Sequence, residues 1–190
     1  DVRIVISEYG AGANVEHQTS DLSITPDPKG QFFPETYQTY YHEVTYSAIE
    51  KYPFIWSSYV WNMFDFALPE WSRGGVRGRN HKGLITYDRK IKKDAFYWYK
   101  ANWSEEPVLY LAGRRNDSLN TNVTTIKAYC NFGTPELFIN GKSVGSMDEG
   151  INSVQYISED VNLLNGKNKI EIKAVKKDKA FTDMFLLNVD

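Results

Sequence analysis

The sequence contains little cysteine and little histidine: one of the former and three of the latter in 190 residues. A single thiol, Cys130, excludes a framework of intrachain disulfides. The three histidines stand far apart, and no second thiol accompanies them in the spacing that metal sites use. We therefore expect no metal site and no cofactor.

Basic charge and long apolar runs are also missing. A formal net charge of -2 argues against nucleic acid as a partner, because phosphate binding needs clustered Lys and Arg in excess. No run of about 20 apolar residues is present that could span a bilayer, so we expect no membrane partner. No basic region followed by an apolar signal core opens the chain. Residues 2–6 are instead typical of a buried strand, with no turn or linker before it. We expect a piece of a longer polypeptide, with the upstream part as a partner.

The first hundred or so residues alternate short apolar runs with helical patterns, which predicts parallel strands joined by crossover helices. The first strand ends at Ser7 and Glu8, and a second buried strand covers residues 54–61. Between them a helix is expected from Pro34 to before Pro53. Its aromatic and apolar residues recur at helical spacing and should pack against a sheet. They are Tyr37, Tyr40, Tyr41, Val44 and Ala48.

A long Gly-rich and Arg-rich loop follows over residues 69–83, and then a last helix with Phe96, Tyr99 and Trp103 on one face. From about Pro107 the pattern changes to alternation with a period of two, punctuated by turns. This pattern predicts an antiparallel β-sandwich of six or seven strands. Asn140-Gly141 between two apolar runs predicts a type I′ hairpin.

A carboxylate, Glu8, stands at the carboxyl end of a predicted parallel strand, where barrel enzymes build their sites. Trp61 follows the next strand. An indole beside a carboxylate suits a sugar, whose C–H face stacks on aromatic rings while its hydroxyls take polar partners. Two structural alternatives stay open: Glu8 caps a turn, and Trp61 belongs to the core. The three histidines, including His81 near this site, are expected to be structural or exposed, and Asp65 and Asp88 to fix loops through hydrogen bonds.

Five stretches of the first part resemble, in order, the last two strand–helix units of glycoside hydrolase family 2. They are residues 7–11, 61–66, 78–84, 88–89 and 95–100. Residues 136–145 are similar to part of the immunoglobulin-like domain that follows the barrel in many members. The resemblance implies an α/β plus all-β fold: residues 1–105 as the last two units of a TIM (β/α)8 barrel, and residues 106–190 as an immunoglobulin-like β-sandwich.

The resemblance also implies roles for four residues. Glu8 falls on the catalytic nucleophile, and Trp61 on the aromatic residue of the sugar subsite. Asn80 and Lys82 fall on the loop positions that approach the C6 substituent of the sugar. Tyr9 is a further substrate-binding candidate, although packing under the strand is its alternative role. The family's acid/base glutamate belongs to an earlier strand, outside this chain.

The family contains β-galactosidases, β-glucuronidases and β-mannosidases. Asn80-x-Lys82 resembles the pair with which β-glucuronidases read a uronic carboxylate, and nearby Arg73, Arg77 and Arg79 favour an anion. The wider sequence looks more like the galactosidase branch, so we favour hydrolysis of terminal β-galactosides through a glycosyl-enzyme intermediate, with β-glucuronidase as the alternative.

A rival interpretation is a non-catalytic carbohydrate-binding module. The sandwich by itself is expected to be a structural or dimer-forming element, which allows a homo-oligomer. A periplasmic or secreted location is suggested by the resemblance alone.

Overall fold

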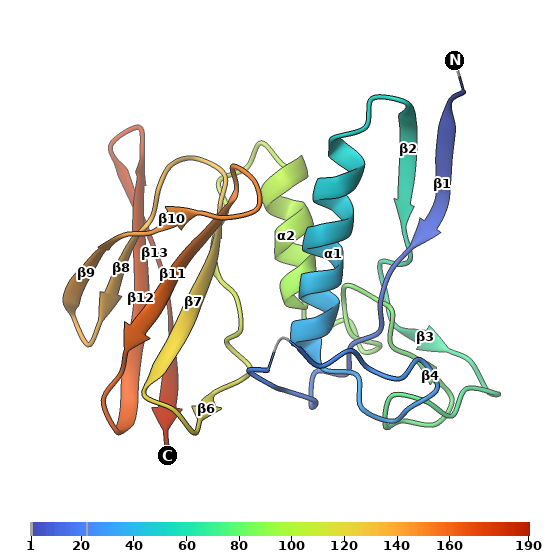
Figure 1. Ribbon diagram of the computed structural model, residues 1–190, viewed down its shortest axis with the longest axis horizontal. Helices are drawn as coiled ribbons and strands as arrows, with labels where there is room; N and C mark the ends of the chain where they lie inside the picture. The colour runs from blue at the N-terminus through green and yellow to red at the C-terminus, as the bar shows by residue number, and fades with distance from the viewer. Residues whose placement is uncertain (1, 22) are drawn as a thin grey trace. The chain divides into compact units, whose positions relative to one another are not determined.

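The computed structural model describes residues 2–21 and 23–190 (Figure 1). The chain divides into two compact units between Phe96 and Tyr97. This division lies inside helix α2 (Asp94–Trp103), earlier than the boundary at 105/106 expected from the sequence. The reason is that the helix packs on strands that follow it. Within the second unit, Tyr97 stacks on Tyr110 with ring centroids 3.7 Å apart, and Trp98 contacts Tyr129 at 5.5 Å.

The first unit opens with two parallel strands joined by a helix. Strand β1 (Ile4–Tyr9) pairs with β2 (Ile55–Val60), and α1 (Glu35–Glu50) lies between them in sequence. This is the strand–helix–strand order predicted from the alternating pattern. A short antiparallel pair, β3 (Phe66–Ala67) and β4 (Arg79–Asn80), follows within the long loop.

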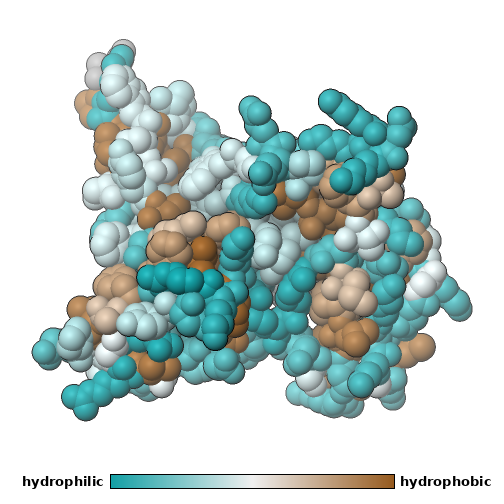
Figure 2. Space-filling view, turned by 180° about the vertical axis from the view of Figure 1, so that it is seen from behind, coloured by the Kyte–Doolittle hydropathy of each residue, from teal (hydrophilic) through white to brown (hydrophobic). Residues whose placement is uncertain are grey.

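The prediction that β1 and β2 are buried strands is wrong for the chain as it stands. Trp56 is 60% exposed and Tyr59 is 59% exposed, and Ile4 and Val5 also face solvent. Among the described residues β1 and β2 form a sheet of two strands, so no further strand lies beyond either of them. Figure 2 shows brown, apolar side chains at the surface in the upper left, where this sheet lies.

The prediction that the apolar face of α1 is buried is also wrong. Tyr40, Val44 and Ala48 are exposed, whereas the buried side chains of this helix are polar. Hydrogen bonds to neighbouring segments explain this choice of face. The Gln38 side-chain amide donates to the Ala11 carbonyl oxygen at 2.8 Å, and the Glu35 carboxylate accepts the first backbone N–H of α2 at 2.7 Å. Buried polar groups of this kind need their partners, and these partners lie on one side of the helix.

The second unit is a β-sandwich. Its strands form one sheet in the order β10-β11-β7-β5 and another in the order β6-β13-β12-β8-β9. Their inward side chains, such as Leu111, Ile126, Leu137 and Ile170, form one buried cluster. The strands are β5 (Leu109–Leu111), β6 (Ser118–Leu119), β7 (Val123–Cys130), β8 (Glu136–Ile139), β9 (Lys142–Ser146), β10 (Asp148–Glu149), β11 (Gln155–Asn162), β12 (Gly166–Lys176) and β13 (Lys179–Val189).

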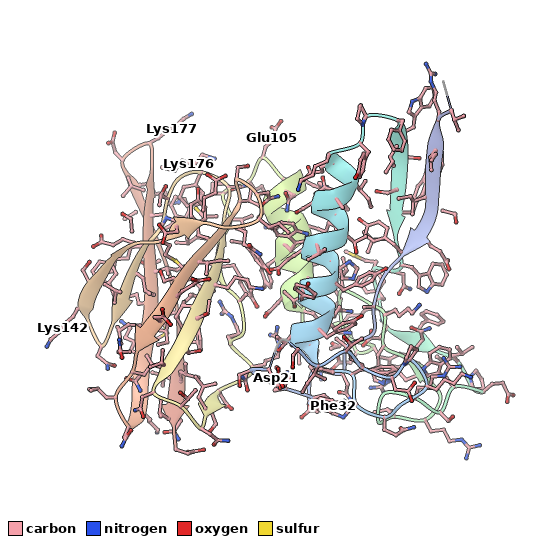
Figure 3. All side chains as sticks on the ribbon, in the orientation of Figure 1. Asp21, Phe32, Glu105, Lys142, Lys176 and Lys177 are labelled. Carbon is pink, nitrogen blue, oxygen red and sulfur yellow. The ribbon has the colours of Figure 1, made fainter. Side chains whose placement is uncertain are left out.

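Two tight hairpins of this sandwich share one turn geometry. Asn140 and Gly141 both have positive φ, 52° and 81°, which confirms the predicted turn between β8 and β9. Lys177 and Asp178 repeat the geometry between β12 and β13, with φ of 47° and 63°. Figure 3 labels Lys142 just after the first turn, and Lys176 and Lys177 at the second.

Helix α2 buries only part of the predicted face. Trp98 and Tyr99 are buried, but Trp103 is 55% exposed. Trp98 is turned inward because it packs on Tyr129 of β7. None of the helices in the described part of the chain is long and apolar enough to cross a membrane.

Candidate functional site

The ends of β1 and β2 meet at a close backbone approach. The Trp61 N–H donates to the Tyr9 carbonyl oxygen at 2.7 Å. A Cβ atom added at Gly10 would collide with the Trp61 carbonyl oxygen, so only glycine lets the two chain segments pass this closely. The residues that follow both strands are thereby held beside each other.

Three of the expected site residues lie on these strand ends. Glu8 is exposed near the end of β1. Tyr9 is buried, 7% exposed, and its ring lies 6.0 Å from that of His42. Trp61 is 39% exposed and meets Phe66 edge to face at 6.0 Å. Its side chain is therefore partly open to solvent.

Two long loops of the first unit are tied together. The Asn14 side-chain amide donates to the Gly74 carbonyl oxygen at 2.9 Å, and the Gly74 N–H donates to the Gly30 carbonyl oxygen at 3.1 Å. The Arg73 guanidinium donates to the Pro28 carbonyl oxygen at 3.1 Å and lies over the Trp71 ring at 4.2 Å. These contacts fix the loop after β1 to the loop before β4.

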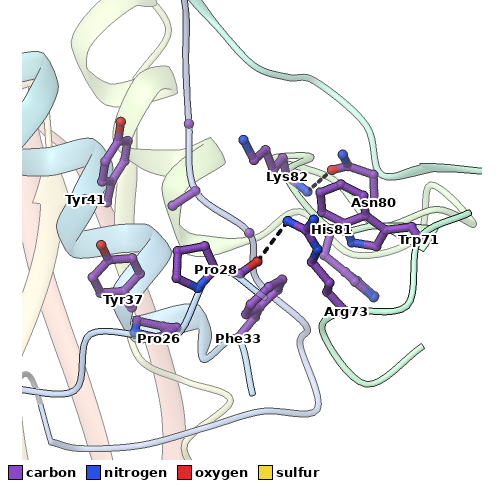
Figure 4. A pocket seen from close by; sticks show the side chains of 13 residues that line it. Pro26, Pro28, Phe33, Tyr37, Tyr41, Trp71, Arg73, Asn80, His81 and Lys82 are labelled. Atoms are coloured by element: carbon purple, nitrogen blue, oxygen red, sulfur yellow. Dashed lines mark hydrogen bonds between the residues drawn. The ribbon is translucent and has the colours of Figure 1, made fainter. Parts of the chain in front are cut away.

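A cavity of about 220 Å³ lies between these loops and α1 (Figure 4). One part of its wall is polar and cationic, formed by Arg73, Asn80 and Lys82. The rest is mainly apolar and aromatic, with the two tyrosines Tyr37 and Tyr41 facing the cations across the hollow. The remaining lining residues are Gly10, Ala11, Gly12, Pro26, Pro28, Phe33, Trp71 and His81. A concave, mostly apolar site with a few converging polar groups is typical of small-ligand binding.

The turn that carries Asn80 and Lys82 is well defined. Asn80 is buried, and its side-chain oxygen accepts the backbone N–H of Lys82 at 2.9 Å. The Lys82 carbonyl oxygen in turn accepts the N–H of Asn62 at 3.1 Å. The turn is thereby joined to the segment that follows Trp61.

A buried ion pair lies beneath this turn. The Lys93 ammonium, 0% exposed, donates to an Asp65 carboxylate oxygen at 2.9 Å and to the carbonyl oxygens of Ala13 and His81 at 2.7 Å and 3.1 Å. Burial raises the pKa of Asp65, and the charge of Lys93 works against this rise. Burial, and to a smaller extent the charges of Lys93 and Arg79, together lower the pKa of His81 to about 4.

The structure brings Asn80 and Lys82 into one cavity with Gly10, two residues after Glu8. Tyr9, Glu8 and Trp61 do not line it. Within residues 2–21 and 23–190, the cavity wall includes no Asp or Glu, and no three His, Cys, Asp or Glu side chains are grouped to hold a metal ion.

Sequence reasoning gave no role in the site to Lys93, or to the wall residues Tyr37 and Tyr41. Lys93 lies in a basic run, residues 90–93, which is typical of a solvated surface, and only the tertiary structure reveals its burial. Arg73 was expected as one of three anion-favouring residues, but it alone of the three lines the cavity. The expectation that Asp65 fixes a loop through hydrogen bonds is confirmed, since its carboxylate accepts the Gly83 N–H at 2.9 Å.

No protein-family model matches the chain. A β-glucuronidase of Bacteroides fragilis is 42% identical over 184 residues, which are 96% of this chain and 26% of that protein. The crystal structure of a Bacteroides fragilis protein assigned as a β-galactosidase matches with a TM-score of 0.92 and 47% identity, over 98% of this chain and 28% of that one. The structure of an FMN-binding β-glucuronidase from Faecalibacterium prausnitzii matches with a TM-score of 0.82 and 38% identity, over 97% and 27% of the two chains.

The chain therefore spans about a quarter of the length of the relatives it matches. Over nearly all of its own length it is similar to proteins named as β-glucuronidase and β-galactosidase, which are glycoside hydrolases.

Proposed function

We propose that this chain forms part of a retaining β-glycosidase of glycoside hydrolase family 2, and that the whole enzyme hydrolyses β-glucuronides. In this proposal residues up to about 105 belong to the catalytic barrel and the β-sandwich is the immunoglobulin-like domain after it. The observation that carries the choice of sugar is the cavity in which Lys82 and Arg73 lie beside Asn80.

The charges of this cavity favour an anionic sugar. A guanidinium and an ammonium can both bind a carboxylate, and an amide adds a neutral hydrogen bond. Among the described residues, no carboxylate on the cavity wall would repel a uronic acid. The aromatic and proline side chains opposite would contact the apolar parts of the ligand. This arrangement shifts our preference from the galactoside favoured by the sequence to a glucuronide.

The proposed chemistry is double displacement. Glu8 attacks the anomeric carbon and forms a glycosyl-enzyme intermediate, while a protonated carboxyl group donates to the leaving oxygen. The same group, once deprotonated, activates the water that releases the sugar with its configuration retained. The resemblance assigns this acid/base residue to another part of the longer protein. Trp61 is proposed to stack on the sugar, and its half-exposed ring supports that role.

A β-galactosidase remains the second candidate. It is favoured by the match to the Bacteroides fragilis protein assigned to that activity, which is 47% identical to this chain. In this case Lys82 and Asn80 would bind a neutral C6 hydroxyl instead of a carboxylate.

Covalent labelling of the full-length enzyme tests both proposals. The enzyme is incubated with 2-deoxy-2-fluoro glucuronyl fluoride or with the galactosyl fluoride, and the labelled peptide is identified by mass spectrometry. We expect the glucuronyl reagent to label Glu8, and the variant Glu8→Gln to take up no label. A label from the galactosyl reagent alone would favour the second candidate. Modification of another carboxylate in the wild-type enzyme would exclude Glu8 as the nucleophile.

A further inference from the structure

The buried pair Asp65–Lys93 holds the turn of Lys82 from both sides. On one side, the Lys93 ammonium donates to the carbonyl oxygen of His81, the residue before Lys82. On the other, the Asp65 carboxylate accepts the N–H of Gly83, the residue after it. The two side chains are joined to each other at 2.9 Å. One ion pair therefore fixes the backbone on both sides of Lys82, a cationic residue of the cavity wall.

The same ammonium also reaches the segment after β1. Lys93 donates to the Ala13 carbonyl oxygen at 2.7 Å, and the Ala13 N–H donates to the His81 carbonyl oxygen at 2.9 Å. Gly10, Ala11 and Gly12, which precede Ala13, line the cavity. Lys93 thus connects the two sides of the cavity that come from the loops after β1 and before α2.

The close packing around this pair leaves little room for it to shift. Asp65 is 2% exposed and Lys93 is 0% exposed. A Cβ atom added at Gly83 would collide with the backbone of Phe64 and Asp65. Removing Lys93 would leave Asp65 uncompensated, and the carbonyl oxygens of Ala13 and His81 would lose the donor that holds their backbone in place.

We propose that Lys93, together with Asp65, acts as a positioning residue that sets the place of the Lys82 ammonium in the sugar site. It acts without touching the substrate. This inference rests on the proposed function, because it assigns Lys93 to the recognition of the same C6 substituent. A displacement of about 1 Å at such a group can reduce a rate by about 100-fold.

A double-mutant cycle in the full-length enzyme tests the proposal. The variants are Lys93→Met, Lys82→Met and the double variant, and kcat and KM are measured on p-nitrophenyl β-D-glucuronide. Lys92→Met serves as the matched control, since it removes an exposed lysine next to Lys93. Thermal unfolding of each variant separates loss of folding from loss of positioning. Asp65→Asn, a change of nearly equal volume, replaces Lys93→Met if the latter does not fold.

We expect Lys93→Met to reduce kcat/KM on the glucuronide by about 100-fold when Lys82 is present. When Lys82 is already Met, Lys93→Met should reduce kcat/KM by less than about 10-fold, because the ammonium that Lys93 positions is gone. Lys92→Met should leave kcat/KM within about twofold of the wild type, as a surface change does. Equal losses with and without Lys82 would overturn the proposal and leave Lys93 a structural residue.

The wild-type enzyme tests the proposed function separately. If it hydrolyses the β-galactoside and not the glucuronide, the choice of sugar is wrong, and the cycle is measured on the galactoside with the same criterion for Lys93. A wild type without activity on either sugar would reject both the proposed function and the positioning role.

Discussion

At the scale of single residues, two buried histidines make stability depend on pH. Burial lowers the pKa of His42 from 6.5 to about 3, and that of His81 to about 4, with the charge of Lys93 adding to both shifts. Both rings are therefore neutral in the folded protein at pH values where the unfolded chain already binds protons. The free energy of unfolding should fall as the pH drops from about 6.5 to about 4, by up to about 1.4 kcal/mol per pH unit for each histidine.

Hydrogen exchange of peptides from α1 in the full-length protein measures this effect, after correction for the intrinsic pH dependence of exchange. We expect lower protection at pH 5 than at pH 7 in the wild type. His42→Gln should reduce the difference between the two pH values, whatever it does to stability at pH 7. An unchanged difference in this variant would show that His42 does not titrate on unfolding.

The candidate site was predictable from sequence only where a short motif carried it. Asn80 and Lys82 stand in a recognisable stretch, and the structure places both in one cavity. Lys93 gave no such signal, because its burial depends on Asp65, which lies 28 positions away in sequence. A lysine in a basic run looks solvated until its tertiary partners are known.

At the scale of elements, the close approach of the chain at the ends of β1 and β2 depends on the absence of a side chain at Gly10. Gly10→Ala would place a methyl group against the Trp61 carbonyl oxygen, which is rigid backbone. We expect the strand ends to separate. The value of kcat/KM should then fall by about 100-fold or more, because Glu8 and part of the cavity wall belong to the backbone segment that would move. Steady-state kinetics of the full-length enzyme measures this.

Gly30→Ala is the control for that change, because its added methyl would lie 3.1 Å from the Asp27 carbonyl oxygen in a surface turn. It should cost less than about 1 kcal/mol of stability and little activity. A similar fall in kcat/KM in Gly10→Ala and Gly30→Ala would contradict a special role for the close approach at Gly10.

The second hairpin of the sandwich offers a gain in stability. Asp178 has a φ of 63° in a two-residue turn, a conformation that costs a residue with a Cβ atom more than it costs glycine. Asp178→Gly should raise the free energy of unfolding of the sandwich by about 0.5–1 kcal/mol. Urea unfolding of the two proteins measures the difference.

Gly141→Ala in the first hairpin is the opposite change at the same turn position, where φ is 81°. It should lower stability by a similar amount. A loss of stability on Asp178→Gly would mean that the aspartate side chain makes a compensating contact in the turn.

The order and type of the elements were predictable, but the faces that the helix and strands of the first unit bury were not. Periodicity located α1 and the two parallel strands, and Asn140-Gly141 located a hairpin. The exposed positions of Tyr40 and Trp56 were not predictable, because burial depends on what packs against an element and not on its own pattern.

At the scale of the whole chain, the two units should differ in their ability to fold alone. The sandwich contains a continuous buried cluster, including Leu111, Leu137 and Ile170, and its long strands are paired. The first unit exposes apolar side chains on both β1 and β2, and each of these strands pairs only with the other among the described residues. Open strand edges with apolar side chains are sites of aggregation.

We therefore expect residues 94–190, which keep α2 whole, to be soluble and to unfold in one cooperative transition when expressed alone. Residues 1–105 should aggregate, because burying β1 and β2 needs further strands, and a barrel made of parallel strands must close on itself. Size-exclusion chromatography and calorimetry of the two segments measure this. A soluble, monomeric and cooperatively folded segment 1–105 would contradict the assignment of these residues to part of a larger barrel, because two strands and their helices would then suffice.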